Sequence, residues 1–339
     1  MPMPSNDDAF GQVPVVLVGS GRSGTTWVLD TIAEANGMNC IFEPLHPILG
    51  GAAQRFSNRY LVATDSEPEL ARFIGSILRG QHPGFWTRYR ERPRRLYPSL
   101  EVVSSVSAAK HWVKRWQYVL QHHRRFRMMR GRPLIVKFIR ANLMLGWIKA
   151  NFPCRILHVL RHPLAVIESK MRLWEQDWDP NGPLQSYLSD PRLTADLDAD
   201  WDAVRSAAAS SAAAAHAAIW CIENLIPLRQ APNLGLVTTF YECLASEEAA
   251  AEWVRVISCL GLERVPSRAS LARPSQQASA ATRERLFTKG RIGLIDVRSK
   301  LGEDRVADIA CMLDRFDVRV YDVNRYEPIN TTNLIDRKC

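Results

Sequence analysis

An apolar run that leads into a glycine-rich turn is the feature of this sequence that most constrains its fold. Residues 13–19 read Val-Pro-Val-Val-Leu-Val-Gly, a continuous apolar stretch typical of a buried parallel strand. The chain continues as Gly19-Ser-Gly-Arg-Ser-Gly-Thr-Thr-Trp27, and residues 24–36 carry apolar side chains at helical spacing. A strand, a turn and a helix in this order predict the first unit of an α/β fold.

Strand and helix patterns alternate along the rest of the chain. Further strands are predicted at 134–138, 155–160 and 234–240, and helices at 67–78, 163–175, 204–228 and 247–260. This alternation predicts one three-layer α/β/α domain over residues 1–339, with a central parallel sheet.

Two stretches interrupt the alternation. Residues 47–131 read as a basic helical insertion, which includes a second predicted helix at 104–127. Residues 177–202 are rich in Asp, Pro and Gly, and we interpret them as a mobile loop.

Positive charge is concentrated in the insertion. The chain has a net charge of +9, and the segment from Arg79 to Arg132 holds fourteen Lys or Arg residues against Glu91 and Glu101 alone. Partners that carry phosphate, sulfate or carboxylate groups are favoured by such a cluster, although a solvated basic face is an equal alternative. The segment has no nucleic-acid motif, so no specific nucleic-acid partner is predicted.

The composition of the chain bears on the cellular compartment in which we expect the protein. No apolar run approaches the ~20 residues that a membrane-spanning helix needs, and the first twelve residues do not resemble a signal peptide. Seven cysteines without C-x-x-C spacing argue against a disulfide framework or a zinc site. A reducing, cytoplasmic location is therefore expected.

The glycine-rich turn is suited to binding an anion. Its glycines allow successive N–H groups to converge, and the following helix adds the partial positive charge of its N-terminus. Gly19 and Gly24 have the spacing of the nucleoside-triphosphate loop G-x-x-x-x-G-K-[ST], but Thr25 replaces the lysine that reaches the β- and γ-phosphates. Arg22 supplies a cation at another position, so the turn is predicted to hold a phosphate-like group other than a triphosphate. The alternative is a turn without a ligand.

Two motifs resemble those of the sulfotransferases that use 3′-phosphoadenosine 5′-phosphosulfate (PAPS). Arg22-Ser-Gly-Thr-Thr-Trp27 is similar to their 5′-phosphosulfate loop, which implies that Arg22, Ser23, Gly24, Thr25, Thr26 and Trp27 bind the donor. Residues 155–169 resemble their 3′-phosphate motif, with Arg161 at a strand end and Ser169 two helical turns beyond. A guanidinium fork and a hydroxyl can share one phosphomonoester in this way.

Two later segments extend the resemblance. Phe240-Tyr-Glu-Cys-Leu244 resembles the R-Y-E-D-L segment of the family, which implies that Tyr241 lies near the adenine. Phe287-Thr-Lys-Gly290 resembles the R-K-G segment, which implies that Lys289 and Gly290 contact phosphate. Thr288 stands where the family often has Arg.

Sulfuryl transfer to a hydroxyl needs in-line positioning, cations and a base. Arg22 and Lys137 are the candidate cations, because Lys137 ends a predicted strand whose carboxyl end faces the ligand crevice. An exposed Lys137 without a role is the alternative.

The base is the least regular part of the resemblance. Small-molecule sulfotransferases have a histidine two residues after the lysine, where this chain has Ile139. Lys137-Phe-Ile-Arg140 and Phe42-Glu-Pro-Leu45 instead resemble segments of carbohydrate sulfotransferases. We therefore predict Glu43 as general base, with a pKa raised by apolar neighbours. His46 is the runner-up, and an ion pair of Glu43 with Arg140 is the structural alternative.

These observations together predict a PAPS-dependent sulfotransferase without a metal. Its acceptor is expected to present a hydroxyl on a carbohydrate or glycoconjugate, and the acceptor could be anionic. The alternatives are a P-loop nucleotide kinase or hydrolase, which the missing loop lysine disfavours, and a non-catalytic polyanion-binding protein.

Overall fold

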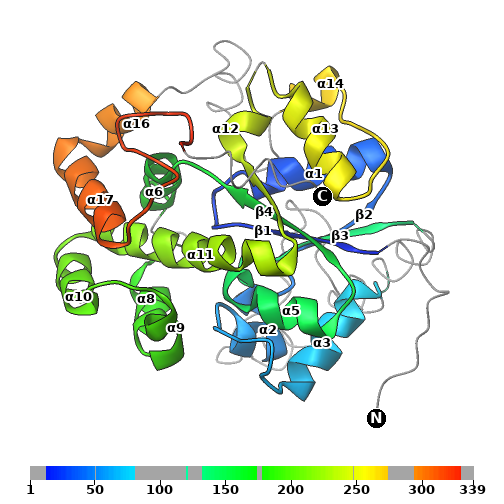
Figure 1. Ribbon diagram of the computed structural model, residues 1–339, viewed down its shortest axis with the longest axis horizontal. Helices are drawn as coiled ribbons and strands as arrows, with labels where there is room; N and C mark the ends of the chain where they lie inside the picture. Colours follow the sequence, from blue (N-terminus) through cyan, green and yellow to red (C-terminus); the bar gives the residue numbers. More distant parts are fainter. Residues whose placement is uncertain are drawn as a thin grey trace, which may run out of the picture.

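A five-stranded parallel sheet forms the centre of the computed structural model, which describes residues 13–49, 51–80, 120, 132–173, 178–246, 248–273 and 294–329 (Figure 1). The strand order is β2-β3-β1-β4-β5. The strands are β1 (Val15–Val18), β2 (Asn39–Phe42), β3 (Leu134–Lys137), β4 (Arg155–Leu160) and β5 (Val237–Phe240). The predicted α/β class and parallel sheet are confirmed.

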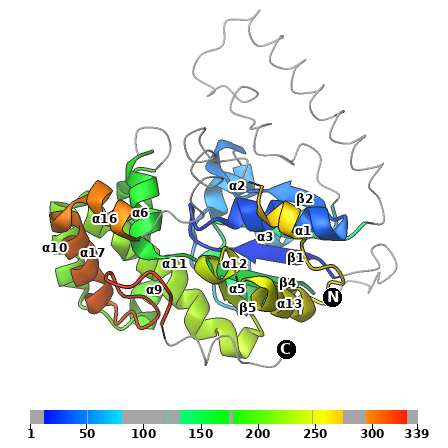
Figure 2. The ribbon, with the colours of Figure 1, turned by 90° about the horizontal axis from the view of Figure 1, so that it is seen from above.

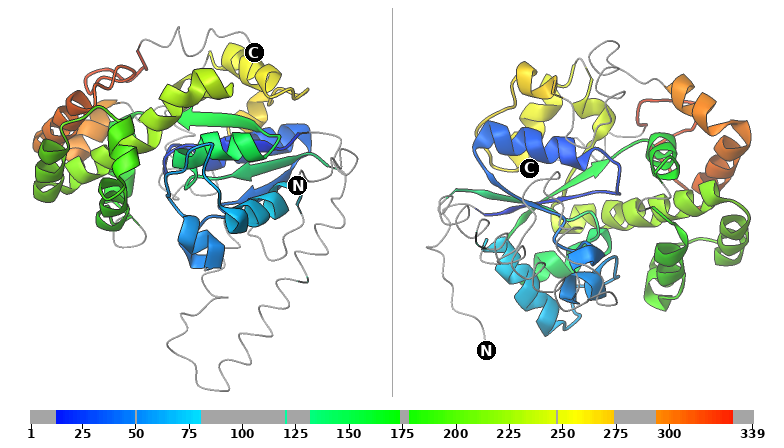
Figure 3. Two further views of the ribbon diagram at one scale, coloured as in Figure 1. Left: turned by 60° about the horizontal axis from the view of Figure 1, so that its bottom comes forward. Right: turned by 180° about the vertical axis from the view of Figure 1, so that it is seen from behind.

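Helices cover both faces of the sheet, as Figures 1 and 3 show from opposite sides. Val15 and Leu17 of β1 face α1 (Thr25–Asn36) and α13 (Ala250–Cys259). Val16 and Val18 face the other layer, which contains α3 (Pro68–Leu78) and α5 (Leu145–Asn151). Each β1 side chain is fully buried, because successive residues of a strand point to opposite faces and both faces are covered.

A second group of helices packs beside the sheet (Figure 2). It comprises α6 (Pro163–Met171), α8 (Asn181–Leu188), α9 (Pro191–Asp196), α10 (Trp201–Ser210), α11 (Ala212–Leu234), α16 (Leu294–Leu301) and α17 (Glu303–Arg315). The remaining short helices are η1 (Pro47–Leu49), α2 (Gly51–Phe56), η4 (Asn142–Met144), α12 (Tyr241–Leu244) and α14 (Arg268–Leu271).

The interpretation of residues 177–202 as a loop is wrong for the secondary structure, because α8 and α9 lie within them. Asp190 and Asp200 cap helices here: Asp190 accepts hydrogen bonds from the N–H groups of Arg192 and Leu193, and Asp200 accepts one from Ala203. The prolines stand at or just before first helical turns, where a proline costs nothing. Residues that favour turns thus serve here as helix starts.

Two other boundaries differ from the predictions. The alanine-rich helix expected at 204–228 is broken at Ser211, whose extended backbone ends α10 and whose hydroxyl caps α11. The edge strand β2 has no counterpart in the prediction, because Asn39 opens its four residues and shortens the apolar run. The helix expected at 104–127 lies outside the described residues except at position 120, as does most of the basic segment from Arg79 to Arg132.

None of the helices in the described ranges combines the length and the apolar character that crossing a bilayer requires. Among the cysteines of these ranges, five are free thiols, whereas Cys259 is disulfide-bonded. The cysteine count is therefore not a guide to the redox compartment of the chain.

Candidate active site

All the motif residues that the structure describes lie at the carboxyl edge of the sheet. The glycine-rich turn follows β1, Glu43 follows β2, Lys137 ends β3, Arg161 follows β4 and Tyr241 follows β5. In parallel α/β sheets this edge is where ligands bind. The parallel register that pairs Lys137 with Leu17 and with Phe42 brings three of these strand ends together.

The turn between β1 and α1 depends on two glycines. Gly24 caps α1 with a left-handed backbone at φ 82°, and a Cβ there would lie 2.3 Å from the ring of Tyr241. A Cβ on Gly19 would lie 2.4 Å from the carbonyl oxygen of Val159. Arg22 also adopts a positive φ, 75°, which is uncommon for a residue with a side chain. The turn is thus tightly packed and its backbone is held in an unusual conformation.

The hydroxyl side chains of the turn are buried at the start of α1. Ser23, Thr25 and Thr26 are all nearly inaccessible to solvent. The Ser23 Oγ atom has no hydrogen-bond partner in the described part of the chain. Buried hydroxyls are nearly always hydrogen-bonded in native proteins, so this atom is suited to a ligand that the turn would hold.

Lys137 reaches this turn from the neighbouring strand. Its Nζ donates to Thr26 Oγ1 at 2.9 Å and to Glu43 Oε1 at 2.8 Å, and it lies 4.0 Å from the centre of the Phe42 ring. The side chain is buried, which rules out an exposed lysine without a role. Burial lowers the pKa of Lys137, while the charge of Glu43 opposes that shift. Lys137 therefore places a cation beside the N-terminus of α1. In a triphosphate loop, the lysine that Thr25 replaces here would provide that cation.

Glu43 is held between two cations. Oε1 accepts from Lys137, and Oε2 accepts from Arg140 Nη1 at 2.8 Å. The expectation that its pKa is raised is wrong. Burial does raise the pKa of Glu43, but the charges of Lys137, Arg140 and His46 outweigh burial and lower it to about 2. The ion pair with Arg140, which the sequence left as the alternative, is present together with the contact to Lys137.

His46 lies one turn beyond Glu43. Its backbone N–H donates to the Glu43 carbonyl at 3.0 Å, and its side chain is buried. Both candidate bases therefore belong to one short segment after β2. This segment begins with a strained residue, because Glu43 has a φ of 42°.

Arg161 and Ser169 are brought together through Arg22. Arg161 Nη1 donates to the Arg22 carbonyl at 3.0 Å, and Arg22 Nε donates to Ser169 Oγ at 2.9 Å. Arg161 Nε is buried and has no hydrogen-bond partner among the described residues. Residues 22–27 and residues 155–169, which are far apart in the sequence, thus meet around the side chains of Arg22 and Arg161.

Two aromatic rings, those of Tyr241 and Trp27, lie beside the Arg161 guanidinium. The Arg161 guanidinium lies 4.6 Å from the centre of the Tyr241 ring, and Tyr241 meets Trp27 edge to face at 5.6 Å. Stacking with a guanidinium and with rings is a common way for proteins to bind a flat, aromatic group. Lys289 and Gly290, with Thr288, lie outside the described residues.

Glu242, which the sequence analysis did not single out, is a buried carboxylate that holds two segments next to the site together. It accepts hydrogen bonds from the His162 N–H at 3.0 Å and from the Tyr321 hydroxyl at 2.7 Å. It thereby ties the turn after β4 to the segment after α17. Its position next to Tyr241 was the one signal in the sequence for this role. Its hydrogen-bond partners could not be inferred, because they are 79 and 80 positions away.

A cavity of about 490 Å³ adjoins the turn. Gly21 and Arg140 line it on the side of the site, and the Trp178 ring packs so closely on Gly21 that a Cβ there would lie 2.2 Å from the ring. Lys170 and Glu223 line the cavity from α6 and α11. The sequence analysis missed both residues, because Lys170 lies one residue beyond the 155–169 motif and Glu223 is a single charge within an apolar helical run.

Comparisons with known proteins leave the family open. No protein-family model matches the sequence, and no curated protein is significantly similar to it. A sulfotransferase from Alicyclobacillus acidocaldarius is 14% identical with a TM-score of 0.36, over 90% of this chain and 96% of that one. The sulfotransferase domain of the Synechococcus PCC 7002 olefin synthase is 15% identical with a TM-score of 0.39, over 95% and 99%. Likeness at this level supports no conclusion about the activity of the chain.

Proposed function

We propose that the chain is a sulfotransferase that moves the sulfuryl group of PAPS to an acceptor hydroxyl on a carbohydrate or glycoconjugate. One observation carries this proposal: Lys137 joins the first turn of α1, through Thr26, to the carboxylate of Glu43. A cation for the transferring group and a carboxylate for the acceptor proton thus meet beside an anion-binding turn. The motif resemblance to PAPS-dependent sulfotransferases supports the same assignment.

The chain offers separate groups for the two ends of the donor. The backbone of the turn and the Ser23 hydroxyl would bind the 5′-phosphosulfate at the N-terminus of α1. Arg161, with its unpartnered Nε, and Ser169 would bind the 3′-phosphate. Tyr241 and Trp27 would border the adenine. Two of the buried atoms that have no hydrogen-bond partner among the described residues, Ser23 Oγ and Arg161 Nε, fit a bound donor.

The reaction requires one S–O bond to form and one to break. Glu43 would take the proton of the acceptor hydroxyl as its oxygen attacks sulfur. Lys137 and Arg22 would stabilise the charge that develops on the sulfonate and on the departing phosphate oxygen. No group has to be oxidised or reduced in this exchange.

Glu43 with a pKa of about 2 is a weak base when both cations hold it. A hydrogen bond from Lys137 to the sulfonate would take the place of its hydrogen bond to Glu43 and so weaken one of the interactions that lower this pKa. The carboxylate would then become a stronger base only when the donor is in place. This order of events protects PAPS from premature reaction with water.

Parallel assays with two labelled donors test the proposal. Purified protein is supplied with sulfur-labelled PAPS or with γ-labelled ATP, together with neutral glycosides, anionic glycans and a phenol. Label from PAPS is expected on at least one hydroxyl acceptor, and label from ATP is expected on none. Lys137→Ala is expected to remove the transfer from PAPS. Label from ATP on an acceptor would instead indicate a kinase.

A further inference from the structure

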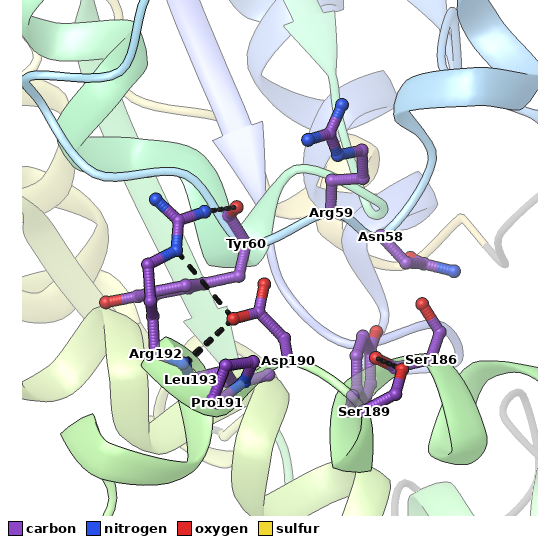
Figure 4. A pocket seen from close by; sticks show the side chains of 10 residues that line it. Asn58, Arg59, Tyr60, Ser186, Ser189, Asp190, Pro191, Arg192 and Leu193 are labelled. Atoms are coloured by element: carbon purple, nitrogen blue, oxygen red, sulfur yellow. Dashed lines mark hydrogen bonds and ion pairs between the residues drawn. The ribbon is translucent and has the colours of Figure 1, made fainter.

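A second cavity lies next to the one beside the turn. It has a volume of about 380 Å³ and is bordered by Asn58 and Tyr60 on one side and by residues of α8 and α9 on the other (Figure 4). Asn58 lines both cavities. They also share a wall, because the Tyr187 hydroxyl in the second donates at 3.2 Å to Glu223 Oε1 in the first. The two cavities therefore adjoin at Asn58, between Gly21 and α9.

Among the described residues that line the first cavity, no cation is left without an acidic partner, and the exposed carboxylate of Asp179 accepts hydrogen bonds from Asn181. Arg140 is paired with Glu43 at 2.8 Å. Lys170 lies 3.8 Å from Glu223, whose other contacts are hydroxyl donors. Burial and the charge of Lys170 lower the pKa of His216 to about 3, so its imidazole is neutral at pH 7. An anionic group of an acceptor would have to give up water here without gaining a counter-charge.

The arginines that line the second cavity are likewise paired with acidic residues. Arg192 contacts Asp65 at 2.9 Å and Asp190 at 3.8 Å, and Arg59 contacts Glu67 at 3.3 Å. Beside these pairs, the side chains of Ser186 and Ser189 lie opposite Asn58 (Figure 4). Hydroxyl and amide groups donate and accept hydrogen bonds without charge, as the hydroxyls of a polyol do.

We propose that the two cavities form one acceptor channel, and that it takes an uncharged, hydroxyl-rich chain of at least two units, such as a neutral oligosaccharide. The reacting unit would lie between Gly21 and Arg140, and the remote unit would contact Asn58, Ser186 and Ser189. Each cavity alone has the volume of a small-ligand site, ~300–1,000 Å³, so a single unit would leave the second space unused. This inference rests on the proposed sulfuryl transfer for the direction of the acceptor.

Three variants separate the remote contacts from the chemistry. Asn58→Gly removes the carboxamide and suits the backbone, since Asn58 has a φ of 59°. Ser186→Ala with Ser189→Ala removes two hydroxyls on the opposite wall. Ser210→Ala is the matched control, because this exposed serine also bonds the carbonyl three residues earlier but lines neither cavity.

The variants are assayed with PAPS and a panel of neutral methyl glycosides, each as one, two and three sugar units, and with the corresponding uronic acids. For the wild type, KM is expected to fall with length and to be lowest for a neutral acceptor. Asn58→Gly and the double serine variant should raise KM for the longer acceptors by about 2- to 10-fold, the value of a neutral hydrogen bond. For the double serine variant, whose residues line only the second cavity, KM for the single unit and kcat should stay within about 2-fold, as should every value for Ser210→Ala.

A KM that does not change with acceptor length overturns the channel, as does an equal effect of the double serine variant on short and long acceptors. A preference for uronic acids overturns the uncharged class. Binding of the trisaccharides in the presence of 3′-phosphoadenosine 5′-phosphate, followed by NMR, separates the two proposals. Binding that depends on length and on Asn58, without sulfated product, supports the channel and contradicts the proposed activity. Transfer without any dependence on length does the reverse.

Discussion

The Nζ atom of Lys137 lies 2.8 Å from Oε1 of Glu43, and both side chains are buried where β3 and β2 end. The pairing of the two parallel strands sets this contact, because Phe42 is in register with Lys137 and Glu43 follows it. The Glu43 N–H also donates to the Lys137 carbonyl at 3.0 Å. A candidate base and a candidate cation are therefore held together by backbone as well as by charge.

Replacing Glu43 tests its role as base. Glu43→Gln keeps the shape of the side chain and removes the proton acceptor, so kcat should fall by ~10²–10⁴-fold. Binding of 3′-phosphoadenosine 5′-phosphate, measured by calorimetry, should change little. His46→Ala is the comparison, and it should cost much less activity. A nearly active Glu43→Gln beside an inactive His46→Ala would move the role to His46.

Stability at acidic pH tests the ionised state of Glu43. Its pKa is lowered from 4.5 to about 2 on folding, so its ionised form stabilises the native protein above pH 4.5. This contribution is lost as the pH falls toward 2, because the carboxylate becomes protonated. From the two pKa values, the wild type should lose about 2 kcal/mol between pH 5 and pH 3 relative to Glu43→Gln. Denaturant unfolding of both proteins at several pH values measures the difference, and a constant difference would show that Glu43 is not held ionised.

Arg161 is predicted to recognise the 3′-phosphate. Arg161→Ala removes a charge-assisted contact worth ~1.5–3 kcal/mol, so affinity for 3′-phosphoadenosine 5′-phosphate should fall by about 10- to 150-fold. Adenosine 5′-phosphate lacks the 3′ group and should lose far less. Calorimetric titration of both nucleotides into both proteins checks this. An equal loss for the two would place Arg161 elsewhere on the nucleotide.

Arg22 is predicted to act on the transition state. Arg22→Ala should lower kcat more than it lowers affinity for the desulfonated product, because charge on the departing oxygen appears only as the S–O bond breaks. Arg22→Lys keeps the charge at the same strained backbone position, φ 75°, and should retain more activity. Losses of rate and of affinity in the same proportion would make Arg22 a binding residue only.

The local parts of the fold and site were predictable from the sequence, and the parts made by distant contacts were not. The turn from Gly19 to Gly24 and the strand that ends at Lys137 depend on neighbouring residues, and both lie where the sequence places them. The sign of the Glu43 pKa shift depends on Lys137 and Arg140, which are 94 and 97 positions away. An apolar neighbourhood could be inferred from Ile41 and Phe42, but the paired cations could not.

The helical group beside the sheet shows the same limit. Asp190 and Asp200 are favoured both in turns and at helix N-caps, so the composition of this segment did not decide between a loop and the starts of α9 and α10. Glu223 carries no motif either, yet it receives hydrogen bonds from Ser20 of the turn and from Tyr187 of α8. Such residues become visible only when α11 is placed against the sheet.

The proposed function requires a site that prefers a 3′-phosphorylated nucleotide to a triphosphate. Calorimetric titration of the wild type with 3′-phosphoadenosine 5′-phosphate and with ATP, with and without Mg²⁺, measures this preference. The 3′-phosphorylated nucleotide should bind at least about 10-fold more tightly, since ATP leaves Arg161 without its charge-assisted partner. Tighter binding of ATP, strengthened by Mg²⁺, would contradict the account and favour a nucleotide kinase or hydrolase.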